Sequence, residues 1–257
     1  KRYVSSLLKI FEGDFGRSIR YRAEESVRLF ISSTFTDTHV LRNFLIRKVW
    51  PDMEQWCRQK GMGFSVTDLR WGIQNLAVDE HNASAVCLNE VKRCNLHSTG
   101  PFFVFICTSK YGWRPLPAAV EVDELEKVLE CVDNAEDKEY VLSWYERDDN
   151  VIPAQYVLRR ISHHFPSYLS KVRDEHEQAM HKWMEAEQRL QLTLRRAVAN
   201  CTTLSPAAMR RWLTSVTEQE VEAALRHLSA AGQVKSEGGK SERRGEGEGR
   251  GADGDDD

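Results

Sequence analysis

The fold is decided by the stretch Val27-Arg28-Leu29-Phe30-Ile31-Ser32-Ser33-Thr34-Phe35, in which an apolar strand pattern passes into a cluster of hydroxyl side chains. Thr36 and Asp37 follow directly and are typical of a helix start. A strand that leads straight into a helix places its last side chains at the carboxyl edge of a parallel sheet, where open α/β sheets bind ligands and partners. We therefore expect the functional surface at this edge.

Two further strands are predicted downstream, at residues 64–69 and 101–108, with helical segments between them. The connections are long enough for parallel crossovers, so the pattern predicts an α/β fold with a three-stranded parallel sheet. Phe102 to Ile106 form an unbroken apolar run, which indicates a third strand buried on both faces. Asn82 stands where it can cap the helix that runs through Cys94.

The helix after the first strand carries apolar residues at spacings of three and four, which predicts a stripe that packs on the sheet. The residues of this stripe are Val40, Leu41, Phe44, Leu45 and Val49. Pro51 should kink or restart the helix. Gly61 and Gly63 should end it.

Beyond Pro117 the sequence is mainly helical, with helices predicted at 120–132, 136–147 and 171–199 and a possible fourth strand at 156–158. Thr217 to Glu220 has the pattern of a capping box before a last helix, which Gly232 ends. From Ser236 onward nothing can form a core. The sequence thus predicts a lead segment at 1–26, an α/β domain at 27–165, a helical extension at 166–232 and a disordered tail at 233–257.

Composition narrows the classes of function. The 257 residues carry 36 Lys and Arg against 39 Asp and Glu, and a net charge of −3 provides no basic field for nucleic acid. Six cysteines without a Cys-x-x-Cys pair favour a reducing compartment. No apolar run approaches the roughly 18 residues of a membrane span, and no signal peptide is recognisable, so we expect a cytoplasmic protein. A chain that starts with Lys1 could be a piece of a longer one.

No complete catalytic motif is present. Gly238 to Ser241 resemble the end of a phosphate-binding loop, but the upstream glycine is absent and the segment lies in the polar tail. The histidines and cysteines lack metal-ligand spacing, and there is no G-x-S-x-G elbow. We therefore expect neither a metal nor a resident cofactor.

Polar side chains that follow the three strands form a predicted binding rim. Its residues are Ser32, Ser33, Thr34, Asp37, Asp68, Arg70, Trp71, Lys110, Tyr111 and Arg114. Asp68 and Arg70 could instead form a structural pair with each other. Trp71 and Trp113 are more often core or lid residues than stacking platforms.

Glu90 is the candidate catalytic carboxylate, because helical geometry places it partly on the buried face of its helix. A half-desolvated carboxylate near the rim suits acid–base chemistry. A structural ion pair with Arg70, Lys92 or Arg93 is the simpler explanation, since such pairs perturb carboxylates just as readily.

Four motifs in this order make the chain resemble the N-terminal DUF4062, TIR-like domain of NACHT and WD-repeat proteins and of their relatives, telomerase-associated protein 1 and nephrocystin-3. The motifs are Phe30-Ile31-Ser32-Ser33-Thr34-Phe35-Thr36-Asp37, Asp68-Leu69-Arg70-Trp71-Gly72, Cys87-Leu88-Asn89-Glu90-Val91 and Lys110-Tyr111-Gly112-Trp113-Arg114-Pro115. The resemblance covers roughly residues 27–228. Leu41 departs from the family pattern, in which a glutamate usually precedes the arginine equivalent to Arg42.

The resemblance implies a distant relation to Toll/interleukin-1 receptor domains, with a flavodoxin-like sheet. It also implies a place ahead of a NACHT module and a WD-repeat propeller in a signalling ATPase of the STAND type. Two functions follow from it. The first is a protein-interaction module that self-associates or recruits a partner through the rim. The second is cleavage of the nicotinamide bond of NAD, with Glu90 steadying the developing charge, Ser32 and Ser33 near the phosphates and Trp71 beside the base. NAD is expected as a ligand under the second function alone.

Overall fold

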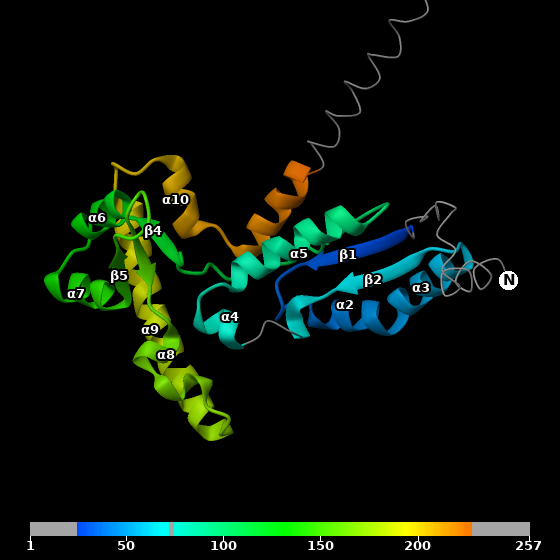
Figure 1. The fold of residues 1–257 in the computed structure, drawn as a ribbon, viewed down its shortest axis with the longest axis horizontal. Helices are drawn as coiled ribbons and strands as arrows, with labels where there is room; N and C mark the ends of the chain where they lie inside the picture. Colours follow the sequence, from blue (N-terminus) through cyan, green and yellow to red (C-terminus); the bar gives the residue numbers. More distant parts are fainter. Residues whose placement is uncertain (1–24, 72–74, 228–257) are drawn as a thin grey trace, which may run out of the picture.

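The structure is a computed structural model that describes residues 25–71 and 75–227. Its first half contains a parallel sheet in the order β2-β1-β3, built from β1 (Ser26–Ser32), β2 (Gly63–Thr67) and β3 (Phe103–Phe105). The predicted three-stranded parallel core is therefore confirmed. Figure 1 shows this half joined to a second, largely helical half that surrounds the long helix α9.

Helices cover both faces of the parallel sheet. α2 (His39–Phe44), the π-helical turn η1 (Leu45–Val49) and α3 (Trp50–Gln59) lie below it in Figure 1, and α5 (Ala83–His97) lies above it. Pro51 stands in the first turn of α3, directly after the π-helical turn, so the predicted restart of the helix is confirmed. Gly61 follows α3 with φ +74°, a left-handed conformation that glycine adopts without strain.

The predicted apolar stripe on the first helix is wrong. Val40 is 69% exposed and Phe44 is 55% exposed, and Leu41 is exposed as well, whereas Arg42 is buried at 1%. The helix turns Arg42 toward the sheet because this guanidinium finds carboxylate and carbonyl acceptors there. The prediction thus fails for Val40, Leu41 and Phe44, which lie on the outer face of the helix, whereas Leu45 and Val49 of the same stripe are half-buried.

The third strand also differs from its prediction. β3 spans three residues rather than eight and lies at the edge of the sheet, where Phe105 is 46% exposed. Within the described residues no fourth strand pairs with it. The exposure of Phe105 shows that the strand is not buried on both faces along its length. Asn82 does occupy the N-cap position of α5, but its side chain makes no capping hydrogen bond.

The second half starts after Pro117. Its elements are β4 (Ala119–Glu121), α6 (Val122–Glu130), α7 (Ala135–Trp144), β5 (Tyr145–Asp148), β6 (Gln155–Leu158), α8 (Ile161–His164), η3 (Pro166–Leu169), α9 (Arg173–Asn200) and α10 (Pro206–Leu213). Its strands form an antiparallel sheet in the order β4-β6-β5. The possible strand at 156–158 is therefore real but belongs to this second sheet. The helix predicted at 136–147 ends at Trp144, because Tyr145 begins a strand that pairs with β6.

The apolar residues of the second half form one large buried cluster along α9. It extends from Leu116 to Trp212 and includes residues on both sides of the expected domain boundary at residue 165. The chain then returns to the first half, where helix 216–227 packs beside α5 and Ala224 joins a smaller cluster with Phe30, Val91 and Phe102. Figure 1 shows this last helix on the same side of the sheet as α5.

Some predictions fall outside the described residues. These are the lead segment up to residue 24, the tail from 233 onward and the end of the last helix at Gly232. α4 (Asn75–Asp79) is a short helix that precedes α5. No helix within residues 25–71 and 75–227 combines the length and the apolarity that crossing a membrane requires.

Candidate functional site

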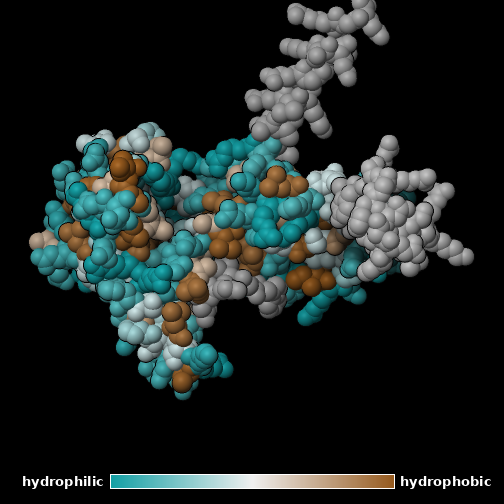
Figure 2. Space-filling view, in the orientation of Figure 1, coloured by the Kyte–Doolittle hydropathy of each residue, from teal (hydrophilic) through white to brown (hydrophobic). Residues whose placement is uncertain are grey.

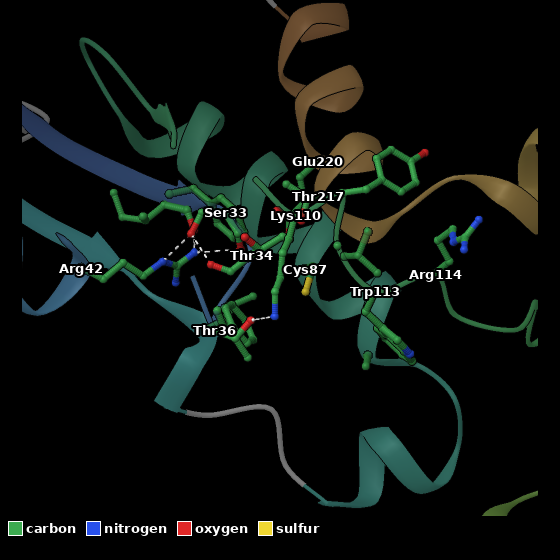
Figure 3. Close-up of a pocket in the computed structure, with 18 residues that line it drawn as sticks. Ser33, Thr34, Thr36, Arg42, Cys87, Lys110, Trp113, Arg114, Thr217 and Glu220 are labelled. Atoms are coloured by element: carbon green, nitrogen blue, oxygen red, sulfur yellow. Dashed lines mark hydrogen bonds between the residues drawn. The ribbon is translucent and has the colours of Figure 1, made fainter. Parts of the chain in front are cut away.

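A cavity of about 510 Å³ opens at the carboxyl edge of the parallel sheet. Its walls come from the exit of β1, the start of α5, the loop at residues 110–114 and the first turn of helix 216–227 (Figure 3). The lining residues are Phe30, Ile31, Ser33, Thr34, Phe35, Thr36, Arg42, Leu69, Ala83, Cys87, Lys110, Tyr111, Gly112, Trp113, Arg114, Val216, Thr217 and Glu220. Ser33, Thr34, Lys110, Tyr111 and Arg114 of the predicted rim therefore meet around one cavity.

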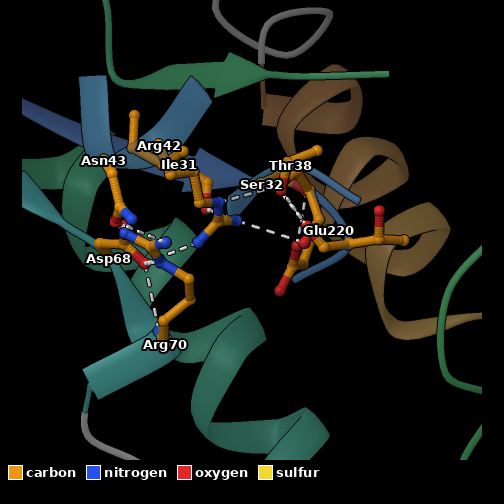
Figure 4. A network of polar contacts seen from close by, with 10 residues as sticks. Ile31, Ser32, Thr38, Arg42, Asn43, Asp68, Arg70 and Glu220 are labelled. Carbon is orange, nitrogen blue, oxygen red and sulfur yellow. Dashed lines mark hydrogen bonds and ion pairs between the residues drawn. The ribbon is translucent and has the colours of Figure 1, made fainter. Parts of the chain in front are cut away.

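Arg42 organises the inner side of this edge (Figure 4). Its Nε donates to Ser33 Oγ at 2.7 Å, and its Nη1 donates to Asp68 Oδ1 at 2.6 Å. Its Nη2 donates to the carbonyl oxygens of Ile31 and Ser33, both at 3.2 Å. Burial lowers the pKa of Arg42, and Asp68 opposes that shift. This guanidinium thus ties the end of β1 to the end of β2.

Asp68 and Arg70 form a structural ion pair with each other, which was the alternative to a role in the binding rim. Arg70 Nε donates to Asp68 Oδ2 at 3.2 Å, and Arg70 Nη1 donates to Asn43 Oδ1 at 3.3 Å. Asp68 therefore accepts hydrogen bonds from two arginines, Arg42 and Arg70. Neither Asp68 nor Arg70 lines the cavity, and both hold the edge together from behind it.

Glu220 is a carboxylate buried deep in the cavity. It extends from helix 216–227 and accepts a hydrogen bond from Ser32 Oγ at 2.5 Å. Burial raises the pKa of Glu220 to about 6, and the bonds from Ser32 and Cys87 together with the charge of Arg42 oppose that shift. Burial also raises the pKa of Cys87 to about 12, so this thiol is protonated and is not a nucleophile near neutral pH.

The outer side of the edge is polar and accessible. Asp37 Oδ2 accepts from Thr108 Oγ1 at 2.5 Å and from the Lys110 backbone N–H at 3.1 Å. These bonds, with one from Thr34, lower the pKa of Asp37 to about 2. Lys110 Nζ donates to Thr36 Oγ1 at 2.7 Å. The rim thus divides into a buried inner part around Arg42 and an exposed outer part around Lys110.

The aromatic residues of the loop at 110–114 contact two helices, α9 in the second half and helix 216–227. Tyr111 Oη donates to Glu218, and Trp113 Nε1 donates to Glu187 Oε1 at 3.1 Å. Trp113 is still 49% exposed and lines the cavity. The side chain of Trp71 lies outside what the structure describes.

Glu90 is held in ion pairs on α5. Its Oε2 accepts from Arg28 Nη2 at 3.1 Å and its Oε1 from Arg93 Nη1 at 2.6 Å. The pair with Arg93 was one of the structural alternatives, whereas Arg28 was not foreseen. Glu90 is not among the residues that line the cavity.

Sequence reasoning missed the two charged residues at the centre of this site. Arg42 stands among apolar residues at spacings of three and four, a pattern that did not mark it as a buried residue. Glu220 was assigned to a capping box, but the helix is capped by Ser215, whose Oγ accepts from the Glu218 N–H at 3.2 Å. The sequence does carry a signal for the true cap of this helix. Ser215 is followed three residues later by Glu218, which is the spacing of a capping box.

Comparison with known proteins identifies relatives of this chain. A family model described as a domain of unknown function, DUF4062, matches residues 28–199. The chain is 31% identical to human NACHT and WD repeat domain-containing protein 2 over 209 residues, which are 79% of this chain and 12% of that protein. No solved structure matches.

Two further relatives are similar over shorter segments. Mouse NACHT domain- and WD repeat-containing protein 1 is 37% identical over 111 residues, which are 43% of this chain and 7% of that protein. Rat telomerase protein component 1 is 35% identical over 117 residues, which are 45% of this chain and 4% of that protein. The chain thus spans a small part of the length of each of these proteins.

Proposed function

The chain belongs to the DUF4062 family, and on that premise we propose that it is a protein-interaction domain of a larger signalling protein with NACHT and WD-repeat modules. It acts by associating with a second copy of itself or by recruiting a protein partner. The names of the relatives support the modular setting.

The observation that carries this proposal is the outward-facing apolar surface of α2 and η1. We call it the α2 face, and its residues are Val40, Leu41, Phe44 and Ile46, which are between 38% and 69% exposed. Figure 2 shows hydrophobic side chains on the surface at α2. Large apolar side chains exposed along one short helical segment are typical of protein–protein contacts.

The buried side of the helix explains why this surface cannot turn inward. Arg42 is fixed by Asp68, Ser33 and two carbonyl groups. Rotating α2 to bury Val40 and Phe44 would break these bonds and leave a charge without partners in the interior, which is costly. The inner part of the rim therefore supports the outward orientation of the α2 face.

No observation favours the second function considered from sequence, cleavage of NAD. Its candidate carboxylate, Glu90, is paired with Arg28 and Arg93. The cavity is lined by Glu220 and not by Glu90.

Light scattering coupled to size exclusion tests the proposed interaction. The 257-residue chain is measured over a wide concentration series, alone and fused to a trimerising coiled coil. We expect concentration-dependent association that the double substitution Val40→Ser and Phe44→Ser removes. The matched control is Met184→Ser with Leu192→Ser, two comparably exposed apolar residues on α9, which should associate as the unmodified chain does.

The result that contradicts the proposal covers both modes of action. It is a chain that stays monomeric alone and no larger than the coiled-coil trimer when fused, together with cross-linking in cell extract that recovers the same proteins with the α2 double variant as with the unmodified chain. Loss of association in the α9 control would place the contact elsewhere.

A further inference from the structure

We propose that the cavity at the carboxyl edge binds a small aromatic molecule that carries an anionic group. This inference stands apart from the proposed protein contact, because it concerns the inside of the edge. The volume of about 510 Å³ lies within the usual range for small-molecule sites, and the carboxyl edge of a parallel sheet is where such sites form. Apolar side chains supply the inner walls, among them Phe30, Ile31, Leu69 and Val216.

The cavity is preformed because three of its four walls touch one another. Gly112 has φ +105°, and a Cβ atom at this position would lie 3.0 Å from Thr217 Oγ1 and 3.3 Å from Thr34 Cγ2. The loop at 110–114 therefore packs directly against the exit of β1 and against helix 216–227. The bond from Ser32 to Glu220 joins the same two walls at the inner end.

The charged side chains at the inner end of the cavity decide which end of a ligand enters first. Arg42 gives four of its five N–H donors to acceptors, and Asp68 offsets its charge, so among the described residues the inner end offers no uncompensated cation. Glu220 adds a carboxylate at that end and would repel a second anion. An anionic group is therefore directed to the mouth, and the ring system enters the apolar interior.

The mouth carries the groups that such a ligand needs. Lys110 points along one side of the cavity toward Thr36, whereas Trp113 and Arg114 lie on the other side (Figure 3). An ammonium group has three donors, and among the described residues one is given to Thr36 Oγ1. The half-exposed rings of Tyr111 and Trp113 offer flat surfaces on which an aromatic group stacks.

Two fluorescent probes that share one ring system test this arrangement on the 257-residue chain. 8-Anilinonaphthalene-1-sulfonate carries a sulfonate, and N-phenyl-1-naphthylamine is its neutral counterpart. Lys110→Gln should weaken binding of the sulfonate about threefold, as expected for one exposed charge contact, and should leave the neutral probe unchanged. Lys110→Arg should bind both probes like the unmodified chain.

Two more variants locate the binding site. Ala83→Leu places a larger side chain in the wall and should weaken both probes, provided that its circular dichroism is unchanged. Phe44→Ser on the α2 face should weaken neither. The proposal is overturned if Lys110→Gln binds the sulfonate as tightly as the unmodified chain does, or if Phe44→Ser removes the binding of both probes.

Discussion

The two buried ionisable residues at the carboxyl edge, Arg42 and Glu220, differ in whether an opposite charge compensates them. Arg42 is matched by Asp68 and by three further acceptors, so its charge is compensated where it lies. Glu220 has Ser32 and Cys87 as hydrogen-bond partners and no direct ion pair among the described residues. Burial without a paired cation favours the protonated carboxyl group. The first residue therefore fixes the edge, and the second makes it sensitive to pH.

The raised pKa of Glu220 predicts that the folded chain loses stability as the pH rises. Its pKa in the folded chain is about 6, above the ordinary 4.5, so the folded state binds the proton more tightly than the unfolded state does. The stabilisation is present in full below pH 4.5 and disappears as the pH rises through 6, and it amounts to about 2 kcal/mol. Glu220→Gln should gain about this much relative to the unmodified chain between acidic and neutral pH. Urea unfolding across this pH range measures it.

The control for Glu220 is Glu130→Gln at an exposed position on α6. That variant should follow the unmodified chain at every pH. Unfolding free energies of Glu220→Gln that run parallel to those of the unmodified chain would show that the carboxyl group titrates normally.

At the scale of elements, the start of helix 216–227 decides how firmly the cavity wall is held. Ser215 is buried and its Oγ caps the helix at the Glu218 N–H, whereas Thr217 lines the cavity. Ser215→Ala should lower the free energy of unfolding by about 1 kcal/mol, as the loss of an N-cap does, and should speed hydrogen exchange in the first turn. Thr217→Ala removes no cap and should change exchange in that turn little. Equal effects of the two substitutions would contradict the assignment of Ser215.

The elements also show which parts of this fold are readable from sequence. β1, β2 and the long helix α9 were predicted because their periodicity and their neighbouring turns agree. The orientation of α2 was not, because the pattern of apolar residues says which face they share but not what that face meets. The contact of Arg42 with Asp68 spans 26 residues of sequence, and that of Ser32 with Glu220 spans 188. Pairings at such distances come from the tertiary fold, so local patterns did not reveal them.

At the scale of the whole molecule, the two halves are linked by buried polar contacts as well as by the chain. Asp79 of α4 is fully buried and accepts from the Ser162 N–H at 2.6 Å and from Ser162 Oγ at 2.9 Å, which joins the segment before α5 to α8. His81 adds a contact to the Arg159 carbonyl oxygen at 2.9 Å.

Removing the acceptor at Asp79 tests whether the halves unfold together. Asp79→Ala leaves the two Ser162 donors without their carboxylate and should cost about 2 to 3 kcal/mol. Because the contact spans both halves, hydrogen exchange should accelerate in β1 and in α9 by similar factors, while Asp149→Ala at an exposed position should change neither. Faster exchange in α9 with an unchanged β1 would show that the parallel sheet and the helical half are independent folding units, and the junction would then be a passive contact.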